Sequence, residues 1–366
     1  MGDDSVAEAI DLGVRIERRG ALCVFSLDRP RALNALNDRM RAAIAAELPG
    51  LMSDPEIYAV AFQSTSERAF CAGGDIRELS ALTQKSLALG RTSLADEYRL
   101  NWQLDCFNKP SVSFINGMCV GSGVGLTLYN THRVAGENYS FAMPETGIGL
   151  FPDLGVCRAL ARMPDQLGVY LGLTGRSIGP VDAYALGLVT HCIPSEQFET
   201  IAAALADAHP IDPLLEMRHK PPADKPALEP VRGLIRDAFS GATVEEIMAA
   251  LAKLSAGAGD HAEFARGVHD DLARRCPTSL KVTLRHLQQA GGQTLKQTLE
   301  ADHRIASHFL AGRDFHEGVR AVLIDRDHKP NWDPKTLADV TVEDVQRYFG
   351  RFDAQELVLV ERSEAQ

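Results

Sequence analysis

The chain has 366 residues, 45% of them hydrophobic, and a formal net charge of -11 at pH 7. This length predicts one large domain with an extension, or two domains, and the hydrophobic content is sufficient for a sizeable core. The negative charge argues against non-specific binding to nucleic acid or to anionic membranes, because both require a basic surface. An anionic small ligand held by a few local Arg or Lys side chains stays compatible with this charge.

Cysteines, histidines and the N-terminus argue against several further classes of protein. The seven cysteines form no C-x-x-C pair and most lie in apolar runs, which is typical of reduced thiols in a cytoplasmic protein. Residues 1–14 are acidic and lack the pattern of a secretory signal or a mitochondrial transit peptide. The longest apolar runs are broken by Pro, Gly and Asp, so we expect no membrane span. The eleven histidines lack the spacing of metal ligands, so we expect no metal site.

Short strands, glycine-rich turns and helices alternate through the first half of the chain. Taken in order, we expect two strands in 14–27, a helix over 37–48, a strand within 55–64, a glycine turn and helix over 69–79, a helix over 93–107, and a strand over 111–120 before a second glycine turn at 121–125. The pattern recurs at a spacing of roughly 45–50 residues, which predicts an α/β core wound as a spiral of similar units.

The character of the chain changes at His209. Residues 209–231 are rich in proline and predict a linker. Beyond them, apolar residues recur with helical spacing after capping residues, as in ATVEEIMAALAKL and TLKQTLEADHRIASHFL. We therefore divide the chain into a core over 12–208, the linker over 209–231 and a mostly helical region over 232–350.

Two glycine turns each precede a helix and suggest a site for an oxyanion. Gly73 and Gly74 lie in CAGGD, and Gly121 and Gly123 flank Ser122 in GSGVG. Glycine lets the backbone approach a ligand closely, and a helix N-terminus adds unpaired N–H donors with a partial positive charge. Two such turns facing one another would hold a developing oxyanion. Taken singly, each turn is more simply explained by tight packing of a strand against a helix.

Two acids lie in the mostly apolar segment PETGIGLFPD, which contains no basic residue to pair with them. A carboxylate in apolar surroundings is costly unless its charge or its raised pKa is used, so Glu145 and Asp153 are candidates for acid–base chemistry. From the pattern alone, Asp153 also suits the N-cap of the helix predicted in LGVCRALARM, and Glu145 suits a surface loop.

Five segments together resemble the enoyl-CoA hydratase/isomerase (crotonase) superfamily, and they occur in that family's order. They are RPRALNALN (29–37), AFCAGGDIREL (69–79), KPSVSFINGMCVGSGVGL (109–126), RVAGENYSFAMPETGIGLFPDLG (133–155) and LGLTGRSIGPVDAYALGLV (171–189). The resemblance implies the crotonase-like α/β spiral of ββα units and a pocket for an acyl-CoA thioester. It also implies an oxyanion hole made by the backbone N–H groups of Gly74 and Ser122, although glycine is usual at the second position.

Within this superfamily, the chain resembles the 3-hydroxyisobutyryl-CoA hydrolase branch. Hydratases of the family typically use two glutamates, of which the first lies three residues past the second oxyanion donor. That position is Gly125 here, which cannot act as an acid or a base. The pattern PETxIGLFPD of the hydrolases is present at 144–153, and the resemblance extends through DEYRLN (96–101) and the helical last third.

This second resemblance implies a thioester hydrolase of valine breakdown with Glu145 and Asp153 as its catalytic pair. It assigns contacts with the substrate to Glu97, Gly73 and Gly121, and contacts with coenzyme A to Arg77, Arg31 and Ala72. Coenzyme A is part of the substrate, so no separate cofactor is expected. Relatives in the family commonly form trimers or pairs of trimers, so a homo-oligomer is one expected state.

Two alternatives stay open from the sequence. The first is an enoyl-CoA hydratase or isomerase that works with one glutamate, against which Gly125 argues. The second is a non-catalytic acyl-CoA-binding protein that kept the fold. The presence of Glu145, Asp153 and both glycine turns argues against it, because an idle site has no need of buried acids.

Overall fold

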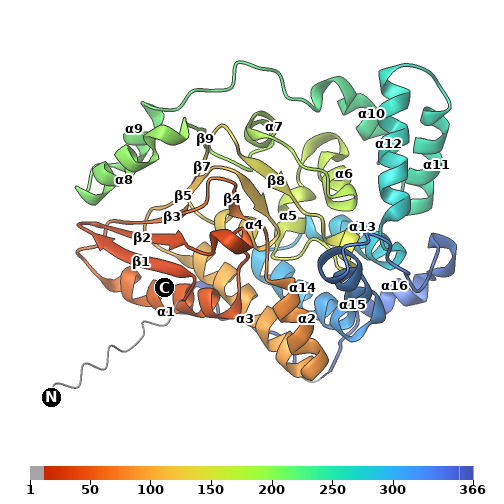
Figure 1. Cartoon of the computed structure of the whole chain (residues 1–366), viewed down its shortest axis with the longest axis horizontal. Coiled ribbons are helices and arrows are strands. Elements are labelled where there is room, and N and C mark those ends of the chain that lie inside the picture. Colours follow the sequence, from red (N-terminus) through yellow and green to blue (C-terminus); the bar gives the residue numbers. More distant parts are fainter. Residues whose placement is uncertain (1–11, 354, 366) are drawn as a thin grey trace.

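The computed structural model describes residues 12–353 and 355–365. The expectation that the N-terminus carries no targeting signal rests on residues 1–14, most of which lie outside this range. Figure 1 shows the strands gathered in one part of the molecule, with helices from the second half of the chain beside them.

The larger sheet has six strands in the order β1-β2-β3-β5-β7-β9. Its strands are β1 (Val14–Arg19), β2 (Leu22–Leu27), β3 (Ala59–Ser64), β5 (Ser111–Ile115), β7 (His132–Ala135) and β9 (His191–Cys192). β1 and β2 form an antiparallel pair, which confirms the two strands predicted in 14–27. All other neighbouring strands in this sheet run parallel.

The smaller sheet has three parallel strands in the order β4-β6-β8. They are β4 (Ala69–Cys71), β6 (Met118–Val120) and β8 (Ser140–Ala142). Each of them follows a strand of the larger sheet, namely β3, β5 or β7. The chain thus adds one strand to each sheet on every turn, which confirms the predicted crotonase-like spiral of ββα units.

The single strand predicted over 111–120 is wrong, because this stretch forms both β5 and β6. The chain turns between them at Gly117, whose φ of +92° lies in the left-handed region. A Cβ at this position would lie 2.9 Å from the backbone of Arg68. The turn therefore depends on a close backbone contact that cannot be recognised from the sequence SVSFINGMCV.

The helices of the core connect and follow the strands of the two sheets. They are α1 (Asp38–Ser53), α2 (Ile76–Lys85), α3 (Leu87–Cys106), α4 (Ser122–Thr127), α5 (Val156–Leu160), α6 (Leu167–Thr174), α7 (Pro180–Ala185) and α8 (Phe198–Ala206). α1 begins as predicted, since the Asn37 side chain accepts the Met40 N–H at 2.9 Å. α3 begins at Leu87 rather than at Ser93. Its extra turns are held by tertiary contacts such as Arg91 Nε to Ser307 Oγ at 2.9 Å.

β2 is buried along its whole length because both of its faces are covered. Phe25 and Leu27 pack in the cluster that includes α1, whereas Leu22 and Val24 pack with α8 and with α9 (Ile211–Glu216). α9 lies inside the stretch 209–231 that was predicted as a linker. No helix or strand follows it until the short turn η5 (Glu229–Val231), and this connection crosses the top of the view in Figure 1.

The last third is helical, as predicted, and the described residues after β9 contain no strand. Its helices are α10 (Arg232–Ala238), α11 (Val244–Ser255), α12 (Asp260–Arg274), α13 (Pro277–Ala290), α14 (Leu295–Ala311), α15 (Arg313–Val319), α16 (Val342–Phe349) and α17 (Arg362–Ala365). α13 packs against α5 and α6, and α14 packs against α3, so this region is joined closely to the core. Across the described ranges, none of the helices is both long and apolar enough to span a membrane.

Candidate active site

A cavity of about 320 Å³ lies where the carboxyl ends of β4 and β6 meet the loop that follows β8. The carboxyl ends of parallel strands are the usual place for a ligand site in an α/β sheet. All the predicted site residues except Arg77 and Arg31 line this cavity: Ala72, Gly73, Gly74, Glu97, Gly121, Ser122, Glu145 and Asp153. Residues from distant parts of the sequence are thus brought to one place.

The two glycine turns face one another across this cavity. A Cβ added to Gly121 would lie 3.5 Å from the Gly73 Cα, and one added to Gly74 would lie 2.8 Å from Ser122 Oγ. Gly73 and Gly121 have φ of +109° and +50°, values that residues other than glycine rarely adopt. Among the hydrogen bonds of the described chain, none is donated by the backbone N–H of Gly74 or Ser122. Both donors are therefore free for an oxygen in the cavity.

Glu145 opens a short 3-10 turn, η2 (Glu145–Ile148), and its residue is only 7% exposed. Its Oε1 lies beside the second turn, since a Cβ at Gly121 would be 3.0 Å away. Its Oε2 has no hydrogen-bond partner among the residues that the structure describes. Burial raises the pKa of Glu145 from 4.5 to about 8, which a backbone hydrogen bond and the Arg275 charge only partly offset. Such a carboxyl group can take up and return a proton near neutral pH.

Asp153 lies at the other end of the same loop and is also buried. Tyr98 of α3 donates its O–H to Asp153 Oδ2 at 2.6 Å. Burial raises the pKa of Asp153 well above its usual range, the charges of Glu145 and Glu97 raise it further, and the Tyr98 hydrogen bond offsets this only in part. The interpretation of Asp153 as a helix cap is wrong, because α5 has Gly155 at its N-cap position and no side-chain cap.

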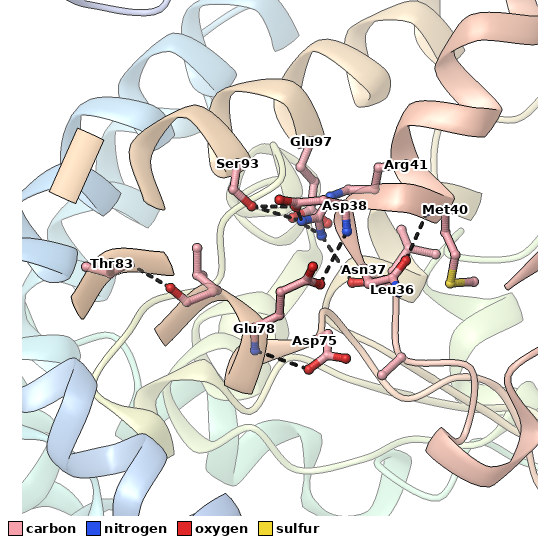
Figure 2. Close-up of polar contacts among 12 residues, drawn as sticks. Leu36, Asn37, Asp38, Met40, Arg41, Asp75, Glu78, Thr83, Ser93 and Glu97 are labelled. Carbon is pink, nitrogen blue, oxygen red and sulfur yellow. Dashed lines mark hydrogen bonds and ion pairs between the residues drawn. The ribbon is translucent and has the colours of Figure 1, made fainter. Parts of the chain in front are cut away.

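Glu97 reaches the cavity from α3 within a cluster of polar side chains (Figure 2). Arg41 Nη1 pairs with Glu97 Oε2 at 3.2 Å, and both side chains are buried. The same guanidinium donates to Ser93 Oγ at 3.0 Å, to the Leu36 carbonyl at 3.2 Å and to Asp38. Glu97 Oε1 has no hydrogen-bond partner within the described ranges. Arg41 therefore fixes the carboxylate while one oxygen stays available to accept a hydrogen bond from a ligand.

Several residues of the cavity were not predicted from the sequence. Arg41 belongs to an ordinary amphipathic helix, and its spacing does not indicate that its charge points inward. The C-terminal region contributes a whole wall of the cavity, made of Arg275, Val322, Leu323 and His328. Arg275 directly precedes CPTSLKVTLRHL (276–287), a segment of the last third that resembles the hydrolases, and this is the one signal that the sequence offers for it.

The two arginines predicted to contact coenzyme A lie outside the cavity lining. Arg77 of α2 donates a hydrogen bond to the carbonyl of Leu323 in the single π-turn η6 (Arg320–Ile324), so it joins α2 to the C-terminal wall. Arg31 is exposed in the short turn η1 (Pro30–Ala32). Their contacts with coenzyme A stay predictions. Within the described residues, no group of three or more His, Cys, Asp or Glu side chains is placed to hold a metal ion.

Gly125, which occupies the position of the first hydratase glutamate, is tightly surrounded by other side chains. A Cβ there would lie 3.0 Å from Asn101 Nδ2 and 3.1 Å from Leu154 Cδ1. Asn101 is buried and donates to the Gly125 carbonyl at 3.1 Å, so it is held in place. A second catalytic glutamate at this position would therefore require Asn101 or Leu154 to move.

Replacing Gly125 with glutamate should destabilise the protein rather than create a hydratase. Overpacking a close-packed core typically costs about 1–3 kcal/mol, and an unpaired buried carboxylate adds to this cost. We expect a clear fall in Tm and no loss of enoyl absorbance from crotonyl-CoA. Gly125→Ala, which adds only the Cβ, should lower Tm less. A G125E protein with the wild-type Tm and strong hydratase activity would contradict this account of the site.

A spiral core in which two glycine turns and two buried acids share one cavity defines the crotonase class of acyl-CoA-binding proteins. The chain matches the family model of enoyl-CoA hydratase/isomerase over residues 22–349 and belongs to that family.

Relatives of known name are similar along nearly the whole chain. The mitochondrial 3-hydroxyisobutyryl-CoA hydrolase of Rattus norvegicus is 38% identical over 353 residues, which cover 94% of this chain and 90% of that protein. 3-Hydroxyisobutyryl-CoA hydrolase 1 of Arabidopsis thaliana is 33% identical, with 94% of this chain and 93% of that protein covered. Among solved structures, a carnitinyl-CoA dehydratase from Mycobacterium thermoresistibile has a TM-score of 0.88 at 33% identity, with 94% of this chain and 98% of that chain covered.

Proposed function

We propose that the protein hydrolyses the thioester of 3-hydroxyisobutyryl-CoA, an intermediate of valine breakdown, or of a similar short 3-hydroxyacyl-CoA. The observation that carries this proposal is the position of Glu145, which is buried beside the second glycine turn. The same cavity is lined by Gly74 and Ser122, whose backbone N–H groups are free. The names of the similar hydrolases support the same reaction and the same acyl group.

The proposed reaction begins with the thioester carbonyl between the N–H groups of Gly74 and Ser122. Glu145 removes a proton from water as the water oxygen attacks the carbonyl carbon, and the two N–H groups stabilise the resulting oxyanion. The C–S bond then breaks and the carboxylic acid product is released. The thiolate of coenzyme A receives a proton from Glu145 or Asp153. In the alternative first step, Glu145 attacks the carbonyl carbon itself, releases the thiolate and leaves a mixed anhydride for water to hydrolyse.

Asp153 is suited to hold a proton during this reaction. Burial and the neighbouring acids raise the pKa of Asp153, so its carboxyl group favours the protonated, neutral form. Oδ2 accepts the Tyr98 O–H, which leaves Oδ1 to orient water or to give a proton to the leaving thiolate. A thiolate is a good leaving group at neutral pH, so this step requires less assistance than the attack on the carbonyl.

Glu97 is proposed to recognise the 3-hydroxyl group of the substrate. Its Oε1 is free of partners in the described chain, and Arg41 fixes the rest of the carboxylate. The test compares thiol release from 3-hydroxyisobutyryl-CoA with release from isobutyryl-CoA, which lacks only the hydroxyl. A site built to accept this O–H should strongly favour the hydroxylated substrate. Equal kcat/KM for the two substrates would refute the proposed acyl specificity.

A one-glutamate hydratase or dehydratase is the second candidate, and the similarity to the carnitinyl-CoA dehydratase favours it. The filled space around Gly125 favours the hydrolase instead. A non-catalytic acyl-CoA-binding protein remains the third candidate, and thiol release from any acyl-CoA would exclude it. The cytoplasmic location and the homo-oligomer stay predictions.

The rate of thiol release should rise with pH. Burial raises the pKa of Glu145 to about 8, so this carboxyl is mostly protonated at lower pH and cannot act as base or nucleophile. We expect kcat/KM to increase from about pH 6 and to level off above the pKa of the free enzyme. Steady-state assays across this range provide the check. A rate that falls as pH rises through the same range would mean that Glu145 acts in its protonated form.

A further inference from the structure

The peptide that follows Asp153 adopts an unusual conformation. Leu154 and Gly155 have φ of +61° and +73°, so two consecutive residues occupy the left-handed region. A leucine in this region is disfavoured and persists only where its surroundings support it. This turn reverses the chain between Asp153 and α5, and it sets the direction from which the Asp153 side chain enters the cavity.

A buried carboxylate of the C-terminal region holds this turn. Asp302 on α14 accepts the Gly155 N–H on Oδ2 at 2.6 Å, and its Oδ1 lies 2.6 Å from Nε2 of His286 on α13. Both side chains are completely buried. The Leu154 carbonyl accepts the Tyr129 O–H. The C=O and the N–H of the Leu154–Gly155 peptide bond are therefore both hydrogen-bonded to side chains.

The imidazole ring of His286 is oriented by its contact with Asp302. A carboxylate can only accept hydrogen bonds, so Nε2 of His286 is assigned as the donor to Asp302 Oδ1. Nδ1 has no partner in the described part of the chain. The ring of Phe151, from the loop with both acids, packs edge-on against the imidazole at 5.7 Å between centroids.

Packing alone does not require a carboxylate at this position. In the described structure, no Lys or Arg side chain pairs with Asp302, and its interior position makes an unpaired charge costly. An apolar residue would fill the space without that cost. The Asp302 carboxylate is hydrogen-bonded to the Gly155 N–H and to His286. Gly155 belongs to the turn that follows Asp153.

We propose that Asp302, held in place by His286, is a positioning residue for Asp153. Its hydrogen bond fixes the Leu154–Gly155 turn and thereby directs the Asp153 carboxyl into the cavity, while Tyr98 holds the carboxyl group itself. This gives the C-terminal helical region a part in catalysis, because α13 and α14 supply the support. The consequence for activity rests on the proposed function, whereas the support of the turn does not.

Two substitutions of Asp302 separate hydrogen bonding from packing. In Asp302→Asn, the amide oxygen can still accept the Gly155 N–H, and the amide nitrogen can donate to His286 once the imidazole proton moves to Nδ1. Nδ1 has no partner in the described chain, so this proton would be buried unpaired and Tm should fall, while the bond to Gly155 is kept. We expect kcat within about threefold of the wild type, since the geometry is retained. In Asp302→Ala the acceptor is lost, and kcat should fall about 10–100-fold while KM changes little, because misplacement of the acid affects the chemical step.

Arg304→Gln is the matched control, because Arg304 lies on the same helix and its guanidinium donates to Glu356 instead of to the turn. It should leave kcat unchanged even if it lowers Tm. Wild-type kcat in folded D302A would overturn the proposal. Loss in D302N equal to that in D302A would also overturn it, because the hydrogen-bond acceptor would then not be the feature that matters.

Hydrogen exchange tests the turn even if D302A does not fold. In the wild type and in D302N, peptides covering 151–158 should show a slowly exchanging Gly155 amide, since this N–H is bonded and buried. Exchange of that amide at the rate of an unstructured peptide would overturn the proposal. This readout does not use the thiol assay. Absence of thiol release from the wild type would therefore count against the proposed function alone.

Discussion

Replacing Glu145 with glutamine should reduce kcat for thiol release by about 10²–10⁴-fold, the usual contribution of a general acid or base. Glutamine has nearly the same shape but cannot take a proton from water or attack a carbonyl. The fold should be retained, because Glu145 Oε2 has no hydrogen-bond partner among the described residues. Thiol release measured with a colorimetric thiol reagent, beside the Tm of the same preparation, gives the result.

The stability of this variant provides a second readout. Because burial raises the pKa of Glu145 from 4.5 to about 8, the folded protein binds this proton more tightly than the unfolded chain. Between these values Glu145 makes the folded state less stable as pH rises. E145Q removes this contribution, so its stability relative to the wild type should increase from pH 5 to about pH 8. Wild-type activity in E145Q would show that the catalytic base or nucleophile is another residue.

Replacing Ser122 with proline should reduce kcat by about 10²–10³-fold, which is the usual cost of removing one oxyanion donor. The substitution removes the backbone N–H and places the proline ring where that hydrogen had been. Ser122 is the first residue of α4, a position at which proline fits a helix, so we expect the fold to survive. Steady-state kinetics should show the loss in kcat for every thioester substrate that the enzyme accepts.

Ser122→Ala is the control for this experiment, because it removes the hydroxyl and keeps the N–H. We expect its kcat within about threefold of the wild type, since an oxyanion hole made of backbone donors is unaffected by the side chain. A large loss in S122A would mean that the hydroxyl, rather than the backbone, contacts the substrate. Little loss in folded S122P would contradict the assignment of this donor.

Local patterns were sufficient to predict much of the core. The sequence of 14–27 predicted the two strands β1 and β2, and that of 37–48 predicted the start of α1, because both depend on neighbouring residues. The resemblance to the crotonases supplied the arrangement of the two glycine turns. The structure shows that Glu145 lies beside one of these turns, which no short-range pattern could establish.

The residues that sequence reasoning missed all act through contacts distant in the chain. Arg41 meets Glu97, which the resemblance had indicated, across 56 positions of the chain, and Asp302 meets Gly155 across 147 positions. A helical acid such as Asp302, in EADHRIASHFL, is on its own indistinguishable from a solvated one. The split of 111–120 into two strands was hidden for the same reason, since the turn at Gly117 is fixed by its contact with Arg68.

The most direct test of the proposed hydrolase is to incubate the wild-type protein with 3-hydroxyisobutyryl-CoA and, separately, with crotonyl-CoA, and to follow free thiol and enoyl absorbance together. We predict rapid thiol release from the hydroxyacyl substrate and no change in the enoyl absorbance of crotonyl-CoA. Loss of enoyl absorbance without thiol release would contradict the account and would identify a hydratase that works with one glutamate.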